Sequence, residues 1–176
     1  MMSNKFAGLI VLIIFGVVSR LIPHPPNFTP VLAIGLFAGF AYPRIYSPMI
    51  LLLIMLISDL FLGFSLITPV VYASITLCGF IGWKVKGAKS MLIGSLIGAI
   101  MFFIITNFAV WCIGPYPYSL IGLIECYVMA VPFFANTLCS CLLYSGILFS
   151  LYAIKPEWYF KRNHDQINKK HFICNN

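Results

Sequence analysis

Four polar side chains that could bind a small solute lie on four different apolar segments: Arg20, Asp59, Asn107 and Asn136. A charge in hydrocarbon costs about 2.5–3.5 kcal/mol or more, so such a residue usually faces a partner or a cavity. We expect Arg20 to bind an anionic group, and Asp59 to bind either a cationic group or Arg20 itself. The two asparagines would give paired hydrogen bonds to a solute. Alternatively, they could join neighbouring helices, for about 1 kcal/mol each.

A proline-rich loop follows Arg20 directly, with the sequence Pro23-His24-Pro25-Pro26-Asn27-Phe28. Prolines stiffen such a stretch in an extended form. We expect this loop either to cover the site as a lid, with His24 and Asn27 as contacts, or to be a short exposed connector.

A second group of candidate residues, Trp111 and Glu125, lies near the end of the apolar region, together with Tyr116, Tyr118 and Tyr127. Trp111 could form a stacking wall for the solute, and Glu125 could be a polar contact. Alternatively, these residues form the aromatic belt that is common where a protein meets the membrane surface.

Catalytic, metal-binding and cofactor-binding patterns are not predicted. Cys139 and Cys141 are two residues apart, so a helix would point them in different directions. No histidine lies within an apolar segment to activate a serine, and Asp59 is the only acidic residue expected within a helix. Without a glycine-rich phosphate loop, energy from ATP must come from a partner. Cys112 and Cys126 are both expected outside and could pair or stay free. We therefore expect a protein that is not an enzyme.

The composition predicts an all-α membrane protein. The 176 residues are 61% hydrophobic and 9% charged, with a mean hydropathy of +1.00, whereas soluble domains have about 25% charged residues. A spanning helix needs about 20 apolar residues, and apolar segments occupy about residues 6–22, 30–42, 48–64, 69–83, 90–113 and 131–154. Residues 1–154 thus form one domain of six transmembrane helices, followed by a basic cytoplasmic tail at 155–176. The short segment 30–42 could be a helix whose outer end is covered by the preceding loop.

Three of these segments begin at a hydroxyl residue followed by proline: Thr29-Pro30, Ser47-Pro48 and Thr68-Pro69. Such a hydroxyl can cap the first free amides of a helix, and proline needs no donor at the first helical position.

The basic residues predict the orientation. If the segments alternate across a bilayer, ten of the eleven lysines and arginines fall on the side of the N-terminus: Lys5, Arg44, Lys84, Lys86, Lys89, Lys155, Lys161, Arg162, Lys169 and Lys170. Cytoplasmic loops carry this excess of positive charge. Both termini are therefore expected in the cytoplasm, with outer loops at 24–29, 65–68 and 114–130. The net charge of +7 belongs to these loops and the tail, which argues against nucleic-acid binding.

The four polar residues of the apolar segments are expected at matching depth. A rise of 1.5 Å per residue puts Arg20, Asp59 and Asn107 in the outer half of the bilayer. Asn136 would lie about five residues below the outer surface. The inner half holds little that is polar beyond Ser95, Ser140, Tyr144 and Ser145. Channels and self-sufficient carriers usually need polar groups on both sides of the midplane. We therefore expect a cup that opens outward and has no path through the protein.

Four sequence blocks carry a resemblance to a known family: RLIPHPPNFTPV at 20–31, SDLFLG at 58–63, NFAVW at 107–111 and PFFANT at 132–137. These blocks resemble the signature of an uncharacterised bacterial family described as candidate transport proteins. The match covers nearly all of the chain before the tail.

More distantly, the layout is similar to the S components of energy-coupling factor (ECF) vitamin transporters. Those six-helix proteins bind micronutrients near the outer face and need a separate transmembrane coupling subunit and ATPases. One departure is that Ala7 is followed by Val11, where the S-component coupling motif Ala-x-x-x-Ala has a second alanine.

Together these features predict a multi-pass protein of the bacterial inner membrane with an S-component-like bundle, which captures a small, vitamin-like solute near the outer face. Its partners would be the solute, the lipid bilayer, and a coupling subunit with ATPases. The alternative is a non-transporting scaffold, similar to the six-span membrane subunit of the cell-shape machinery. An intramembrane enzyme is the least favoured reading. The candidate binding residues are Arg20, His24, Asn27, Asp59, Asn107, Trp111, Glu125 and Asn136.

Overall fold

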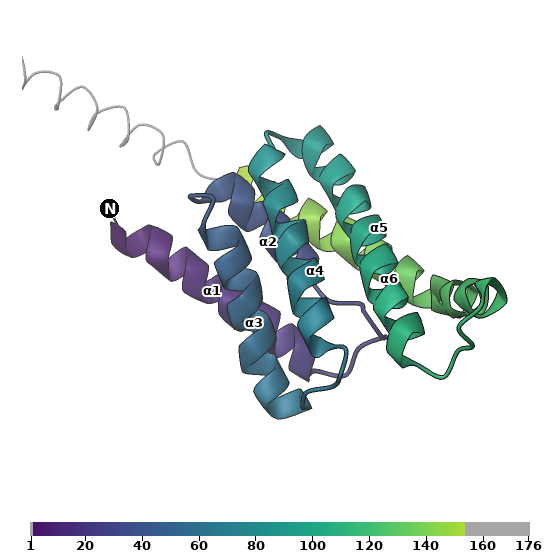
Figure 1. Ribbon diagram of the computed structural model, residues 1–176. Coiled ribbons are helices and arrows are strands. Elements are labelled where there is room, and N and C mark those ends of the chain that lie inside the picture. Colours follow the sequence, from purple (N-terminus) through teal and green to yellow (C-terminus); the bar gives the residue numbers. More distant parts are fainter. Residues whose placement is uncertain (1, 154–176) are drawn as a thin grey trace, which may run out of the picture.

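The structure, a computed structural model, describes the backbone of residues 2–153 and the side chains of residues 6–153. This part of the chain is all-helical, as predicted, and contains no strand. Its elements are α1 (Met2–Leu21), α2 (Val31–Ala41), α3 (Tyr46–Leu62), α4 (Thr68–Ile81), the 3₁₀-helix η1 (Gly82–Lys84), α5 (Ala88–Ile113) and α6 (Leu120–Ala153) (Figure 1). The predicted basic tail at 155–176 lies outside the described residues.

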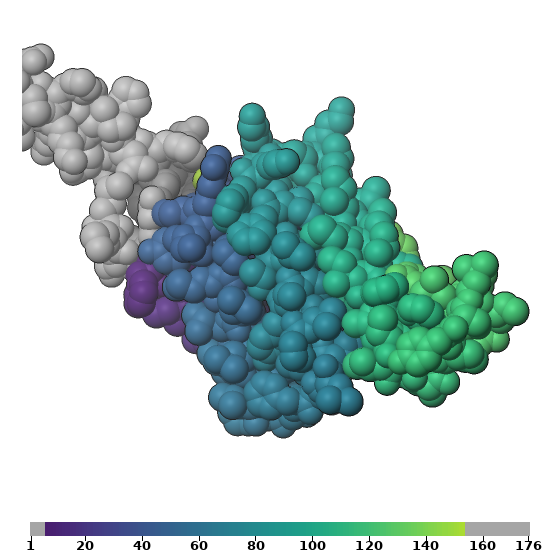
Figure 2. Space-filling view, in the orientation of Figure 1, coloured from purple at the N-terminus to yellow at the C-terminus, as the bar shows by residue number. Residues whose placement is uncertain are grey.

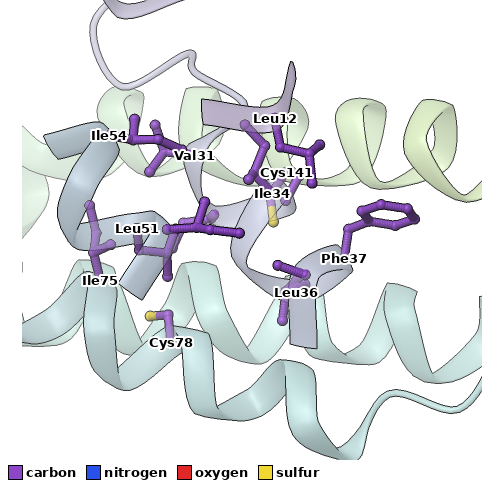
Figure 3. Close-up of a cluster of buried hydrophobic side chains, with 14 of the residues drawn as sticks. Leu12, Val31, Ile34, Leu36, Phe37, Leu51, Ile54, Ile75, Cys78 and Cys141 are labelled. Atoms are coloured by element: carbon purple, nitrogen blue, oxygen red, sulfur yellow. The ribbon is translucent and has the colours of Figure 1, made fainter. Parts of the chain in front are cut away.

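The shortest helix, α2, forms the centre of the bundle. Its residues 31–38 are all buried, and it contacts every other helix of the described chain. Leu51 and Ile54 of α3, Ile75 and Cys78 of α4, and Cys141 of α6 belong to the same buried cluster (Figure 3). A helix that is apolar on all sides is stable only when it is enclosed in this way. Its 11 residues extend only about 16 Å, about half of a bilayer core.

Glycines allow α2 to approach the end of α4 closely. A Cβ atom on Gly39 would lie 2.6 Å from the carbonyl carbon of Gly82, nearer than real Cβ atoms come. Beside this contact, the Ser47 hydroxyl lies 2.7 Å from the carbonyl oxygen of Gly35 and 2.8 Å from that of Gly79. Ser47 is fully buried and can donate to either oxygen, so it links α3 to both α2 and α4.

The hydroxyl groups at the predicted helix starts do not cap their helices. The residues directly before α2, α3 and α4, which are Pro30, Ile45 and Ile67, make no side-chain capping hydrogen bond. Ser47 donates to neighbouring helices, and the Thr68 hydroxyl accepts a hydrogen bond from the Ser65 amide at 2.9 Å. The prolines do mark the starts. Pro30 directly precedes α2 and Pro69 lies in the first turn of α4, where a missing donor costs little.

The start of α6 corrects the sequence prediction. The outer loop was expected at 114–130 and the last helix at 131–154, but α6 begins at Leu120 and includes Pro132. In an apolar environment each unpaired backbone amide costs several kcal/mol, so the apolar residues before Pro132 are more stable when they continue the helix. A proline inside the helix leaves only one carbonyl unpaired, which is the smaller cost. The first turns of α6 project beyond the other helices (Figure 2, green).

Two helices of the described chain, α5 and α6, are long and apolar enough to span a membrane. In the most apolar stretch of each, only 17% and 28% of the residues are buried, whereas the core helix of a soluble protein is mostly buried. Length and composition therefore support two of the six predicted spans directly.

The contact between Gly39 and Gly82 gives a first prediction. Gly39→Ala should lower the stability of the protein by about 1–3 kcal/mol, because the backbones must separate to admit a methyl group. The measurement is the midpoint of thermal unfolding in detergent. Gly146→Ala on α6 is the matched control, since no atom lies within 4 Å of its added Cβ, and alanine favours a helix by about 1 kcal/mol. An unchanged midpoint for Gly39→Ala would contradict the close packing.

Candidate functional site

An ion pair joins the last turns of α1 and α3. The Arg20 Nη2 atom lies 2.7 Å from the Asp59 Oδ1 atom, and the two side chains are 16% and 7% exposed. The Tyr72 hydroxyl on α4 donates a hydrogen bond of 2.9 Å to Asp59 Oδ2. Of the two expected roles for Asp59, the structure therefore has the one in which it binds Arg20, and both carboxylate oxygens are occupied.

The turn after α3 helps to hold Asp59 in place. Gly63 ends this helix in a left-handed conformation with φ 90°, and its amide donates a 2.8 Å hydrogen bond to the Asp59 carbonyl oxygen. Glycine adopts this conformation without a steric penalty, so it ends the helix cleanly. Asp59 is therefore fixed both by its backbone and by its carboxylate.

The Arg20 guanidinium keeps unused donor capacity. It has five N–H groups, and its Nη1 atom lies 2.6 Å from the Met55 sulfur, which is only a weak acceptor. Asp59 is its one strong acceptor among the described residues. Arg20 can therefore donate further hydrogen bonds to a molecule in front of it.

A cavity of about 160 Å³, here called the Arg20 chamber, lies in front of this guanidinium. Its wall combines polar side chains from α1, the following loop and α6 with apolar side chains from α2 to α5: Arg20, His24, Asn27, Thr29, Val31, Leu32, Met55, Leu62, Val71, Ile75, Phe102 and Thr137.

A second cavity, of about 230 Å³, is here called the phenylalanine chamber. It is lined by Asn27, Ile67, Val71, Phe102, Phe103, Thr106, Asn107, Val110, Phe133, Phe134 and Thr137. The two chambers share four lining residues: Asn27, Val71, Phe102 and Thr137. The two chambers are therefore neighbours, here together called the cleft, and their combined volume is at the lower end of the 300–1,000 Å³ range of small-molecule sites.

The loop at residues 22–30 forms one side of this cleft. Asn27 has a positive φ of 62°, which asparagine tolerates better than most residues, and it lines both chambers. The Asn136 amide on α6 donates a 3.0 Å hydrogen bond to the Pro26 carbonyl oxygen, and the Phe28 ring meets the Tyr144 ring edge-on. The loop is therefore fastened to α6 next to the cleft.

The predicted binding residues separate into three groups. Arg20, His24, Asn27 and Asn107 line the cleft. Asp59 and Asn136 line neither chamber, and act instead on Arg20 and on the loop. The Asn107 amide nitrogen also donates to the Phe103 carbonyl oxygen of its own helix, which leaves its side-chain oxygen available to the chamber.

The remaining two candidates lie away from the cleft. Trp111 donates a 3.0 Å hydrogen bond to the Pro117 carbonyl oxygen and packs against Phe108 and Tyr118. Glu125, expected in a loop, is an exposed residue of α6. Both belong to the projecting end of the α5–α6 pair.

The sequence reasoning missed Tyr72 and Thr137. Tyr72 lies in the first turns of α4, which a short connection brings beside the end of α3, so its approach to Asp59 could have been inferred. Thr137 follows Asn136 in the PFFANT block and shares a helix face with Phe133, four residues earlier. The four phenylalanines of the phenylalanine chamber could not be singled out from the sequence, because the chain has 16 phenylalanines.

The described part of the chain offers no cluster of metal-binding side chains. It contains no cluster of three histidine, cysteine or acidic side chains that could hold a metal. Cys112 and Cys126 are free, and the Cys126 thiol lies 3.4 Å from the Asn107 carbonyl oxygen. Of the two alternatives for these cysteines, the structure therefore shows the unpaired one.

Comparison with known proteins gives one match. A model described as a family of unknown function (DUF6580) matches residues 2–163. No curated protein and no solved structure matches the chain. The family's description names no function.

The ion pair gives a second prediction. Arg20→Ala and Asp59→Ala each leave a buried charge unpaired, which typically costs about 3–5 kcal/mol, whereas removal of both charges is often milder. Each single variant should therefore unfold at a lower temperature in detergent than the double variant. Tyr72→Phe, which removes one hydrogen bond and no charge, should cause the smallest loss. Losses that simply add in the double variant would show that the two charges do not stabilise each other.

Proposed function

We propose that this chain, which belongs to that family of unknown function, is a multi-pass protein of the bacterial inner membrane that captures a small solute in the cleft. The observation that carries this proposal is the cleft itself, in which Arg20, His24, Asn27 and Asn107 converge from three parts of the sequence. A few polar groups on an otherwise apolar wall are typical of small-molecule sites.

The surface of the bundle supports a membrane location with six spans. Large apolar side chains are exposed along α1 and α3–α6, among them Val11, Leu56, Leu77, Ile97 and Leu143. Soluble proteins rarely expose continuous apolar patches above a few hundred Å², whereas lipid tails are the matching solvent for such a surface. Five helices would then meet lipid, and the enclosed α2 would be the sixth.

The charge distribution supports an outward-facing cleft. The connections from α3 to α4 and from α5 to α6 lie at the same end of the bundle (Figure 1, lower side), and the cleft residues Arg20, Leu62 and Ile67 belong to this end. Exposed Arg44, Lys84, Lys86 and Lys89 lie on the connections at the opposite end. Because positive loops stay in the cytoplasm, the cleft would open to the outside.

The core below the cleft supports capture without transport by this chain alone. Leu51, Ile54 and Cys78 belong to the buried apolar cluster that fills the centre of the bundle (Figure 3). Movement of the solute would then need a coupling subunit and ATPases. The resemblance of the sequence layout to S components of ECF transporters favours the same arrangement, in which one subunit binds the solute and separate subunits move it.

The projecting end of α6 favours one alternative, a membrane scaffold that binds another protein. Leu120, Ile121 and Val128 are exposed there, beyond the rest of the bundle (Figure 2). In a scaffold, this end would be the functional surface and the cleft would carry no solute.

The proposed orientation is tested by cysteine labelling from outside. A membrane-impermeant thiol reagent applied to intact spheroplasts should label Asn27→Cys and should not label Lys86→Cys until the membrane is permeabilised. The unsubstituted protein measures the background from native cysteines. The reverse pattern would turn the cleft toward the cytoplasm.

Solute capture is tested with whatever small molecule copurifies with the protein and is identified by mass spectrometry. The purified chain should bind this molecule but should not move it into liposomes. Asn107→Leu should weaken binding by about 1–3 kcal/mol, because a buried polar group of the solute loses its partner. Glu125→Gln, on the exposed surface away from the cleft, is the control and should bind normally. Transport by the chain alone would reject the capture mechanism, and the lack of any bound molecule would favour the scaffold.

A further inference from the structure

We propose that the ligand of the cleft is a small aromatic carboxylic acid, with its carboxylate at Arg20 and its ring in the phenylalanine chamber. This inference rests on the proposed function, because it assumes that the cleft holds a solute. It adds the chemical class of that solute, which the two chambers define separately.

The Arg20 chamber fits an anion rather than a cation. Among the described residues, Arg20 is the only lysine, arginine, aspartate or glutamate that lines either chamber. The opposite charge, on Asp59, lies behind the guanidinium and has both oxygens engaged by Arg20 and Tyr72. A ligand in this chamber therefore meets hydrogen-bond donors of the guanidinium, and a cationic group would find no free carboxylate.

The same pair favours a carboxylate over a phosphate. Arg20 and Asp59 together carry no net charge, so the chamber can bind an anion mainly through directed hydrogen bonds. The planar guanidinium matches a planar carboxylate, and the Asn27 side chain, which makes no hydrogen bond within the described chain, can add another. A doubly charged phosphate would need more positive charge than one paired arginine supplies.

The phenylalanine chamber fits an aromatic ring. Phe102, Phe103, Phe133 and Phe134 line it, and none of its lining residues is charged. Aromatic rings favour edge-on or offset contacts with one another, worth about 0.5–1.5 kcal/mol beyond burial. A dry cavity of about 150 Å³ can hold one benzene ring, so about 230 Å³ has room for a ring and a short side chain.

The shared wall limits the distance between the two groups. Because Asn27, Val71, Phe102 and Thr137 line both chambers, the chambers are adjacent, and the proposed ligand would place one group in each of them. The acid and the ring must then be separated by only a few bonds. A long-chain fatty acid has the right head group, but it lacks the ring and exceeds the volume of the cleft.

The test measures dissociation constants of the purified full-length protein for a panel of small probes. The central probe is 3-phenylpropanoate. The comparison probes are 3-phenylpropanamide with a neutral head, 3-phenylpropan-1-amine with a cationic head, phenyl phosphate with a doubly charged head, and octanoate with an aliphatic tail. We expect 3-phenylpropanoate to bind at least about tenfold tighter than each of the others, because each one lacks a single feature that the cleft matches.

Two variants assign the preference to the chambers. Arg20→Lys keeps the positive charge beside Asp59 but removes the planar guanidinium. It should therefore weaken the binding of 3-phenylpropanoate by about tenfold and leave the binding of 3-phenylpropanamide nearly unchanged. Phe133→Ala should weaken 3-phenylpropanoate and leave octanoate nearly unchanged. Phe108→Ala is the matched control for Phe133→Ala. Phe108 is also an exposed phenylalanine, but unlike Phe133 it lines neither chamber.

Each outcome decides a separate part of the proposal. Equal binding of the acid and the amide would overturn the anionic head, and equal binding of octanoate would overturn the aromatic tail and indicate a fatty-acid site. Tighter binding of phenyl phosphate would replace the carboxylate by a phosphate. If no probe binds but the copurified solute still binds in an Asn107-dependent way, the ligand class is wrong and solute capture stands. If the copurified solute does not bind either, the proposed function itself fails.

Discussion

The length of α2 constrains the rest of the molecule. A helix of 11 residues enclosed by all the others fills only part of the bundle's height, and the residues before it must cross the remaining distance without regular structure. That crossing is the loop at 22–30, and the cleft lies beside it, above Val31 and Leu32 at the start of α2. A helix long enough to span the bilayer would occupy this space. The cleft is therefore a consequence of a short central helix.

A buried ion pair beside such a cleft serves two purposes. Arg20 would be costly in an apolar setting without Asp59, and Asp59 would be costly without Arg20 and Tyr72. Together they tie α1, α3 and α4 at the open end of the bundle, where α2 gives no support. Because the carboxylate is behind the guanidinium, the pair also presents donors rather than acceptors to the cleft. The same contact thus supports the structure and sets the polarity of the site.

Several features could be predicted from the sequence because they depend on local patterns. The bounds of α1 to α5 follow from apolar run length and proline positions. The approach of Arg20 and Asp59 followed from their matching depth, since few partners exist for a charge in an apolar bundle. Side-chain direction was harder to predict. Asn136 was expected to contact the solute, but its amide points to the Pro26 carbonyl oxygen, and depth alone does not fix the angle around a helix. Glu125 was misplaced because the last helix was expected to begin at residue 131, whereas α6 begins at Leu120 and contains Pro132.

The 34 residues of α6 are about 51 Å long at 1.5 Å per residue, which exceeds a hydrocarbon core of about 30 Å. Even at a tilt of 40°, the upper end of the usual range, the helix would still cover about 39 Å along the bilayer normal. This mismatch requires several turns at one end to stay in the headgroup region or in water. Counting about 20 residues upward from Ala153 reaches Pro132 and its neighbours. The missing amide of that proline leaves the Val128 carbonyl oxygen free to be hydrated, and Glu125 on the preceding turns keeps its charge in water. In the proposed membrane orientation, the proline would therefore mark the depth at which α6 enters the lipid.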